Sequence, residues 1–206
     1  ELALQRMKNL VKLISILKND KNLEVILVSS GAVGAGYTEL KLDKTILANK
    51  QTLAAIGQPK LMKTYQEMFE EFGITVAQML FIADDFDSRK RSKNAKNVME
   101  ILLQNNVIPI INENDVIATE ELIGDNDQLA AYITHYFKAD MLVILTDIDG
   151  YYDKNPREFN DAKIQKIINE ISQDELDKKP SANSKFATGG IVTKLKAADF
   201  LMQKNI

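Results

Sequence analysis

The sequence has no cysteine and no tryptophan, a single histidine and only four prolines among its 206 residues. Without cysteine there is no disulfide framework, no thiolate nucleophile and no Cys-based zinc site, which suits the reducing cytosol. His135 stands among apolar and aromatic residues in a helical pattern, which favours a packing role and leaves no base for a Ser-His-Asp triad. We therefore expect a cytoplasmic protein that does not depend on thiol or histidine chemistry.

A strong charge bias and long apolar runs are also missing. With 26 basic and 29 acidic residues the net charge is -3, which gives no electrostatic reason to expect a nucleic acid or an anionic membrane as partner. No apolar run approaches the roughly 18 residues of a spanning helix, and the first residues show no signal-peptide pattern. At 45% hydrophobic residues the chain can bury one sizeable core. We expect one domain, 1–206, with a small molecule as its ligand.

Apolar runs alternate along the chain with helical patterns. Helices are predicted at 1–19, 44–72, 88–105, 126–137 and 191–203, and strands at 25–28, 75–82, 107–111 and 141–145. Each strand is a solid apolar run, which is typical of strands buried on both faces. The pattern predicts an α/β fold with a mostly parallel sheet sandwiched between helices. Pro59 is expected to end or kink the long second helix.

Polar or glycine-containing clusters follow three of these strands. Ser29-Ser30-Gly31 follows the first, Asn112-Glu113-Asn114-Asp115 the third and Thr146-Asp147 the fourth. In open sheets of this kind, ligands bind beyond the carboxyl ends of the strands. We expect the three clusters to lie at the same edge of the sheet.

Carboxylates and amides are crowded into the segments 112–115 and 124–127. Asp125 can cap the helix that follows it, which explains one carboxylate. It does not explain the crowding of Asp115, Asn114, Asn126 and Asp127. Repulsion between the carboxylates there favours binding a cation or an ammonium group that offsets it. Direct ligation of a metal stays open, although magnesium often keeps water and substrate phosphates as ligands.

Thr188-Gly189-Gly190 stands directly before a predicted helix, and Lys194 lies about one turn into that helix. Glycines at a helix N-terminus allow backbone N–H groups to approach an anion, and the lysine side chain leans toward the same place. This is the outline of a phosphate site, although a glycine-rich turn with a solvent lysine explains the residues equally well. The spacing is not that of a Walker A motif.

Together these segments resemble the amino acid kinase family, and within it the members that phosphorylate the side-chain carboxylate of L-glutamate. The matching segments run in family order over nearly the whole chain: 28–32, 48–51, 54–58, Arg89, Arg91, Asn94, 111–119, 124–127, 146–147, 150–152 and 188–194. The segments at 146–152 and 188–194 are shared with relatives such as uridylate kinase. The two Asn/Asp clusters are far more particular to the glutamate-phosphorylating members.

The resemblance implies transfer of the ATP γ-phosphate to L-glutamate, with Mg²⁺, as the first step of proline biosynthesis. A carboxylate acceptor is already ionised at neutral pH, so positioning and charge neutralisation suffice. The resemblance implies that glutamate is held by Ser30, Asp115 and Asn126, with Asp125 at its ammonium end. It implies that Asp127 orients the catalytic lysines and that Lys194 neutralises charge on the transferred group.

The resemblance also implies further contacts and partners. ATP would be contacted by Thr146, Asp147, Thr188, Gly189, Gly190, Ile191, Val192, Thr193 and Lys194. No residue is implied as a direct metal ligand. Proline is implied as a feedback inhibitor that competes for the glutamate pocket, and the protein as a homo-oligomer, either a dimer or a tetramer.

The family's domain starts with a strand that carries a Lys-x-Gly-Ser-like phosphate loop, and residue 1 falls after it. The last strands of the domain, and the C-terminal RNA-modification-type domain of some members, also have no counterpart, so we expect the 206 residues to be part of a larger molecule. Two alternatives remain open. One is a nucleotide kinase similar to uridylate kinase, and the other is a non-catalytic amino-acid sensor of the same fold.

Overall fold

A computed structural model describes residues 2–118, 126–146, 149–154, 159–177 and 189–206. The chain divides into two compact units, Glu1–Asn126 and Asp127–Ile206, and each is described by itself. No helix in the described ranges is both long enough and apolar enough to cross a membrane.

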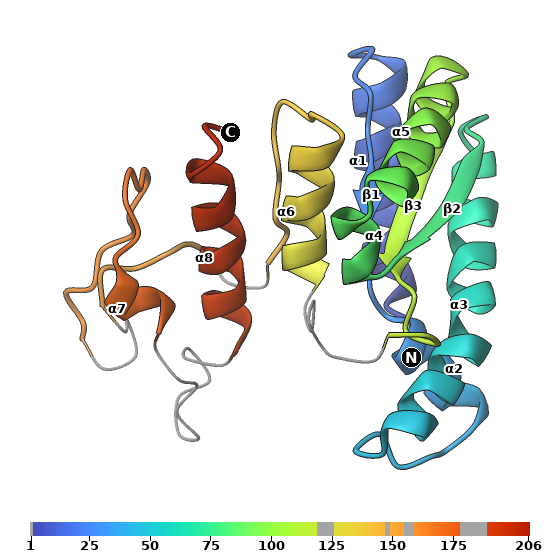
Figure 1. Cartoon of the computed structure of the whole chain (residues 1–206), viewed down its shortest axis with the longest axis horizontal. Helices are drawn as coiled ribbons and strands as arrows, with labels where there is room; N and C mark the ends of the chain where they lie inside the picture. The colour runs from blue at the N-terminus through green and yellow to red at the C-terminus, as the bar shows by residue number, and fades with distance from the viewer. Residues whose placement is uncertain (1, 119–125, 147–148, 155–158, 178–188) are drawn as a thin grey trace. The chain divides into compact units, whose positions relative to one another are not determined.

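The first unit contains a sheet of three parallel strands, β1 (Leu27–Val28), β2 (Val76–Phe81) and β3 (Ile108–Glu113), in the order β1-β3-β2 (Figure 1). The central strand β3 contains the solid apolar run of the sequence, and Ile108, Ile110 and Ile111 are at most 1% exposed. Burial on both faces is what such a run favours. The predicted parallel sheet is confirmed for these strands.

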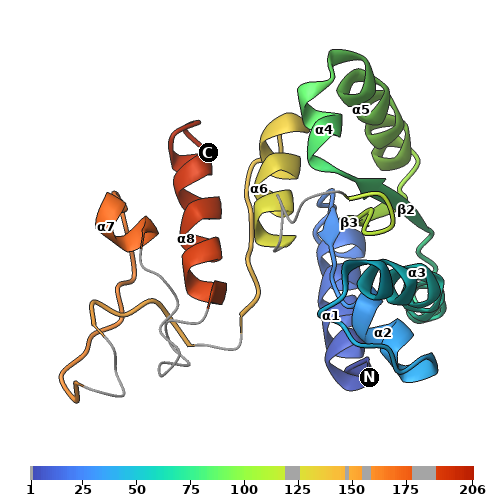
Figure 2. The same cartoon turned by 60° about the horizontal axis from the view of Figure 1, so that its bottom comes forward.

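Five helices lie in the described part of this unit; the second packs on the third, and the other four cover the two faces of the sheet. The five are α1 (Leu4–Asn19), α2 (Ala32–Glu39), α3 (Leu47–Glu70), α4 (Ala83–Asp87) and α5 (Arg89–Gln104). Figure 2 shows α4 and α5 on one face and α1 and α3 on the other. The core beneath α1 and α3 joins Val11 and Phe69 to Leu27 and Ile110 of the strands. Each such side chain contributes about 1.5–3 kcal/mol by its burial, so this layered core is the main source of the unit's stability.

Helix α3 continues through Pro59, so of the two outcomes predicted for this proline, an end or a kink, the end of the helix is wrong. Proline removes the hydrogen bond to the carbonyl of the residue four positions earlier, here Ala55. Ala55 and Pro59 are both exposed, so water can bind that carbonyl. The rest of the helix is fixed by its buried side, which includes Leu53, Leu61 and Phe69.

Helices α2 and α3 touch backbone to backbone. A Cβ atom on Gly36 would lie 1.9 Å from the Leu53 carbonyl oxygen, and one on Gly57 would lie 1.8 Å from the Ala32 carbonyl oxygen. Only glycine permits this approach. The contact fixes the start of α2, directly after the loop that follows β1.

The second unit contains α6 (Asn126–Tyr136, of which Asn126 belongs to the first unit), α7 (Gln173–Leu176) and α8 (Gly189–Met202). A small apolar cluster joins Ala131 of α6 to Ala197 and Leu201 of α8. The His135 ring lies edge-on to Phe200 at 5.7 Å between ring centroids, so this histidine packs as expected.

Residues 141–145 form no paired strand in the described structure, although a strand buried on both faces was predicted there. Leu142 and Ile144 pack against the α6–α8 cluster, whereas Met141, Val143 and Leu145 are 75%, 67% and 60% exposed. Among the described residues of this unit, apolar partners lie against one face of the segment, that of Leu142 and Ile144. The alternation is typical of a half-buried extended chain, and it corrects the prediction.

Candidate functional site

Two of the three polar clusters meet at the carboxyl edge of the first unit's sheet. Strands β1 and β3 are parallel with Val28 opposite Ile111, and the Ser29 amide donates to the Ile111 carbonyl at 2.8 Å. The segment Ser29-Ser30 therefore lies beside Asn112, as the argument from strand ends predicted. The third cluster, at 146–147, belongs to the second unit.

Amide groups at this edge are joined by hydrogen bonds. The Asn126 side-chain nitrogen donates to the Ser29 carbonyl at 2.6 Å and to Asn112 Oδ1 at 3.0 Å. Asn112 Nδ2 donates to Gln58 Oε1 at 2.8 Å, and the Ser29 and Tyr65 hydroxyls share a hydrogen bond of 3.0 Å. The network brings together residues from β1, α3, β3 and the start of α6. It places Asn126, predicted to bind glutamate, next to Ser29 and hence to the predicted Ser30.

Asp115 lies in a turn directly after β3. The turn is closed by bonds from the Ile117 and Ala118 amides to the Asn114 carbonyl, both at 3.1 Å. Burial raises the pKa of the Asp115 carboxyl, and the positive charge of Lys50 opposes that shift. An ammonium group bound at this carboxylate would favour the charged form further. The electrostatics of Asp115 thus suit a cationic ligand.

Within the second unit, Asp127 and Lys194 form an ion pair with 2.8 Å between Oδ2 and Nζ. Their side chains are 14% and 23% exposed, so the pair is mostly shielded from water. The Thr193 hydroxyl also donates to the Asp127 carboxylate, at 3.4 Å. Because a lysine ammonium has three N–H donors, Lys194 keeps donors for a further anion while Asp127 holds it in place.

The other predicted site residues differ in their exposure, and some of them lie outside the described residues. Ser30 is exposed at the end of β1, and Ile191 and Val192 are half-buried in the first turns of α8. Gly189 and Gly190 are the first residues of that helix, which begins two residues earlier than predicted. Thr146 is exposed in the second unit. The predictions for Asp125, Asp147 and Thr188 lie outside the described residues.

Sequence reasoning assigned no role to Asn112, Gln58 or Tyr65. Asn112 belongs to the first Asn/Asp cluster, so its signal was present. Gln58 belongs to the matching segment 54–58 and stands before Pro59, but no individual role was predicted for it. Tyr65 follows the apolar pattern of α3 and is 4% exposed, so nothing in the sequence distinguishes it from a core residue.

The first unit has amides and a carboxylate at the edge of its sheet, and the second unit has a lysine held by an aspartate. The model of the amino acid kinase family matches residues 2–206, and the chain belongs to this family. The chain is also similar in fold to T. acidophilum isopentenyl phosphate kinase, with a TM-score of 0.60 over 98% of this chain and 78% of that one, at 16% identity. The predicted αβα fold class and the resemblance to the family are confirmed.

Closely similar relatives carry one name. The chain is 57% identical to the glutamate 5-kinase of Wolinella succinogenes, over 99% of this chain and 80% of the relative. It is 52% identical to the glutamate 5-kinase of Helicobacter hepaticus, over 97% of this chain and 75% of the relative. It is also 52% identical to the glutamate 5-kinase of Leishmania donovani, over 99% and 77% respectively.

Proposed function

We propose that the chain catalyses the glutamate 5-kinase reaction, in which the γ-phosphate of ATP passes to the side-chain carboxylate of L-glutamate. The bond between the γ-phosphorus and the β,γ-bridging oxygen breaks, a bond to a carboxylate oxygen forms, and ADP leaves. The product, L-glutamyl 5-phosphate, is the first intermediate of proline biosynthesis. The observation that carries the proposal is the 52–57% identity to enzymes of this name over nearly the whole chain.

The acceptor is bound by the first unit in this proposal. Asp115 and the carbonyl oxygen of Asn126 accept hydrogen bonds from the glutamate ammonium group, with Asp125 supporting that end. The Ser30 hydroxyl, exposed after β1, adds a polar contact to the same ligand. No general base is required, because the acceptor carboxylate is already ionised at neutral pH.

Lys194 stabilises charge on the transferred phosphoryl group, and Asp127 orients it. The 2.8 Å ion pair supports these roles because it fixes the ammonium without using all of its donors. Thr146, Asp147 and the segment 188–194 contact ATP. Preorganised positive charge of this kind lowers the barrier most where negative charge is concentrated in the transition state.

Mg²⁺ neutralises part of the ATP phosphate charge when it is bound. The described residues gather no group of three or more His, Asp or Glu side chains that could hold a metal ion. In this proposal phosphate oxygens and water are its main ligands, as is common for magnesium on nucleotides.

We also propose that proline competes with glutamate at the first unit's amide and carboxylate groups, since it carries an ammonium and an α-carboxylate. We propose in addition that the enzyme is cytoplasmic and forms a homo-oligomer, either a dimer or a tetramer.

The decisive experiment is to trap the acyl phosphate. Purified protein incubated with ATP, Mg²⁺, glutamate and hydroxylamine should form glutamyl hydroxamate, and omission of ATP or glutamate should abolish it. A folded sample that binds glutamate yet forms no hydroxamate would support the sensor alternative. Turnover with uridylate in place of glutamate would support the nucleotide kinase alternative.

Asp115→Asn is expected to raise the KM for glutamate by roughly 10- to 100-fold, because it replaces a charge-assisted hydrogen bond by a neutral one. Burial raises the pKa of Asp115 above its ordinary value of 3.8. Ionising this carboxyl therefore costs stability as the pH rises through that raised pKa. The asparagine variant should accordingly have a higher Tm than wild type at neutral pH, and this advantage should shrink as the pH falls.

The pH dependence provides a second measurement on the same variant. The wild-type KM for glutamate should rise as Asp115 becomes protonated at low pH, and the asparagine variant should lack that component. Asp20→Asn, at an exposed carboxylate after α1, is the matched control. Equal KM values and equal pH profiles for wild type and Asp115→Asn would remove Asp115 from the glutamate site.

A further inference from the structure

Four side-chain amides in the first unit form a hydrogen-bonded chain that runs from the surface to Asn126. Gln58 Nε2 on α3 donates to Gln78 Oε1 on β2 at 3.0 Å, and Asn112 Nδ2 on β3 donates to Gln58 Oε1 at 2.8 Å. Asn126 Nδ2 donates to Asn112 Oδ1 at 3.0 Å and to the Ser29 carbonyl at 2.6 Å. Gln58, Asn112 and Asn126 therefore each donate a hydrogen bond in the direction of Gln78.

A backbone group sets this direction. The Glu113 peptide N–H donates to Asn112 Oδ1 at 2.9 Å, and a peptide N–H can only donate. The Asn112 oxygen must face it, so Asn112 Nδ2 must face Gln58 and the Gln58 oxygen must accept. If Asn112 were rotated by 180°, its NH₂ group would oppose both the Glu113 N–H and the NH₂ group of Asn126.

Burial fixes the orientation of the Asn112 side-chain amide, because a rotated amide would lose hydrogen bonds that water does not readily replace. Residue Asn112 is 3% exposed, Gln58 is half-buried, and of the four amide residues only Gln78 at the outer end is exposed. No buried side-chain nitrogen or oxygen within the described ranges lacks a hydrogen-bond partner. In such surroundings water does not readily replace a lost partner, so the loss of one amide disturbs the next.

The chain determines what Asn126 can offer to a ligand. Its two N–H groups are donated to Ser29 and Asn112, so the group left for a ligand is the carbonyl oxygen, which only accepts. An acceptor of this kind suits the ammonium group of an amino acid and disfavours its carboxylates.

We propose that Gln58 is a positioning residue which, through Asn112, holds Asn126 as an acceptor for the substrate's ammonium group. The proposal rests on the proposed function, because it concerns the amino-acid acceptor of that reaction. It goes further because it makes the binding of the ammonium group by Asn126 depend on Gln58, a residue on α3 that does not touch the substrate.

Gln58→Met keeps the length and helix propensity of the side chain and removes both hydrogen bonds. It should raise the KM for glutamate about tenfold, with kcat and the KM for ATP within about twofold of wild type. Gln58→Glu retains the acceptor for Asn112, and Gln78 is free to rotate its exposed amide, so the KM should return to within about threefold of wild type.

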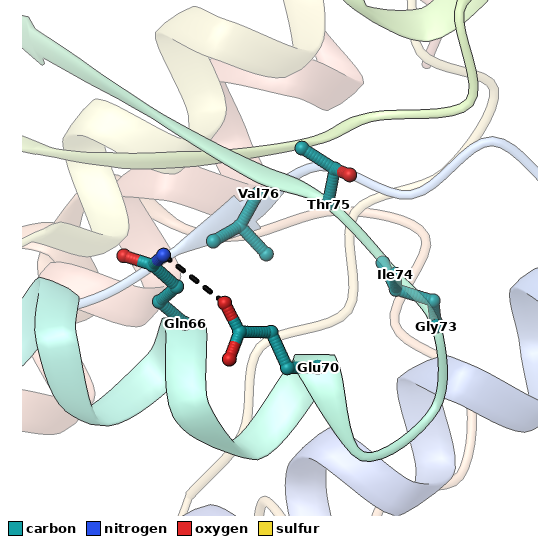
Figure 3. A pocket seen from close by; sticks show the side chains of 6 residues that line it. All are labelled: Gln66, Glu70, Gly73, Ile74, Thr75 and Val76. Atoms are coloured by element: carbon teal, nitrogen blue, oxygen red, sulfur yellow. Dashed lines mark hydrogen bonds between the residues drawn. The ribbon is translucent and has the colours of Figure 1, made fainter.

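Glutarate separates positioning from a general structural role, because it has the reacting carboxylate and no ammonium group. The loss in kcat/KM caused by Gln58→Met should be about tenfold for glutamate and under twofold for glutarate. The matched control is Gln66→Met on the same helix. Figure 3 shows Gln66 in a pocket beside the start of β2, where it donates to Glu70 at 3.1 Å.

The outcomes distinguish a failure of the positioning role of Gln58 from a failure of the proposed function. Equal losses for glutamate and glutarate, or an unchanged glutamate KM in Gln58→Met, would overturn the inference while leaving the proposed function intact. Absence of hydroxamate from wild type would instead overturn the proposed function. If Gln58→Met does not fold, Gln78→Met removes the outer acceptor at an exposed site and should raise the glutamate KM about threefold, and no rise would count against the proposal.

Discussion

Lys194→Ala is expected to lower kcat by about 10³-fold or more, because a phosphoryl-transfer site loses a cation at the transferred group. Binding of glutamate, measured by calorimetry without ATP, should stay within about threefold of wild type, since the lysine is proposed to act on the phosphate and not on the amino acid. The structure strengthens this expectation, because Lys194 is only 23% exposed and is already held by Asp127.

Lys196→Ala is the matched control for this substitution. Lys196 lies two residues further along α8 and is exposed, so its removal should change kcat by less than about twofold. Asp127→Asn should lower kcat as well, but by less than Lys194→Ala, because the lysine then remains and only its orientation is loosened. A Lys194→Ala enzyme with wild-type kcat would show that the ion pair is structural.

The sheet of the first unit was predictable because its strands are solid apolar runs. The run at 107–111 leaves few alternatives to a buried strand, and β3 extends only two residues beyond it, into Asn112 and Glu113. The effect of Pro59 was not predictable from local rules. It depends on which side of α3 faces water, and that is set by packing against α1 and α2.

The candidate site was predictable where it follows from strand order and not where it depends on side-chain direction. Parallel neighbours bring Ser29 and Asn112 to one edge whatever the details of packing. That Gln58 reaches Asn112 requires the position and rotation of α3, which no residue spacing reveals. The pairing of Asp127 with Lys194, 67 residues apart, likewise needs the packing of α6 on α8, although a family resemblance had implied it.

Gly57→Ala and Gly36→Ala should each destabilise the first unit by about 3 kcal/mol or more, which corresponds to a fall in Tm of about 6–12 °C. The added Cβ would lie 1.8 or 1.9 Å from a carbonyl oxygen of the neighbouring helix, and a rigid backbone cannot move aside as a flexible side chain can. The helices α2 and α3 must separate. Since α2 starts directly after Ser30 and Gly31, their separation should also raise the glutamate KM of any folded fraction.

Gly34→Ala tests whether the close approach, and not the loss of glycine, causes this effect. Gly34 lies in the same helix, two residues before Gly36, and is exposed, and a Cβ atom added to it would have no other atom within 4 Å. Alanine there should stabilise the helix by up to about 1 kcal/mol, so its Tm should equal or exceed that of wild type. Thermal unfolding of the three variants measures the difference directly. If Gly57→Ala, Gly36→Ala and Gly34→Ala all changed Tm by the same amount, the close backbone contact between α2 and α3 would not explain the loss of stability. That contact would then not be what holds Ser30 beside Asn126.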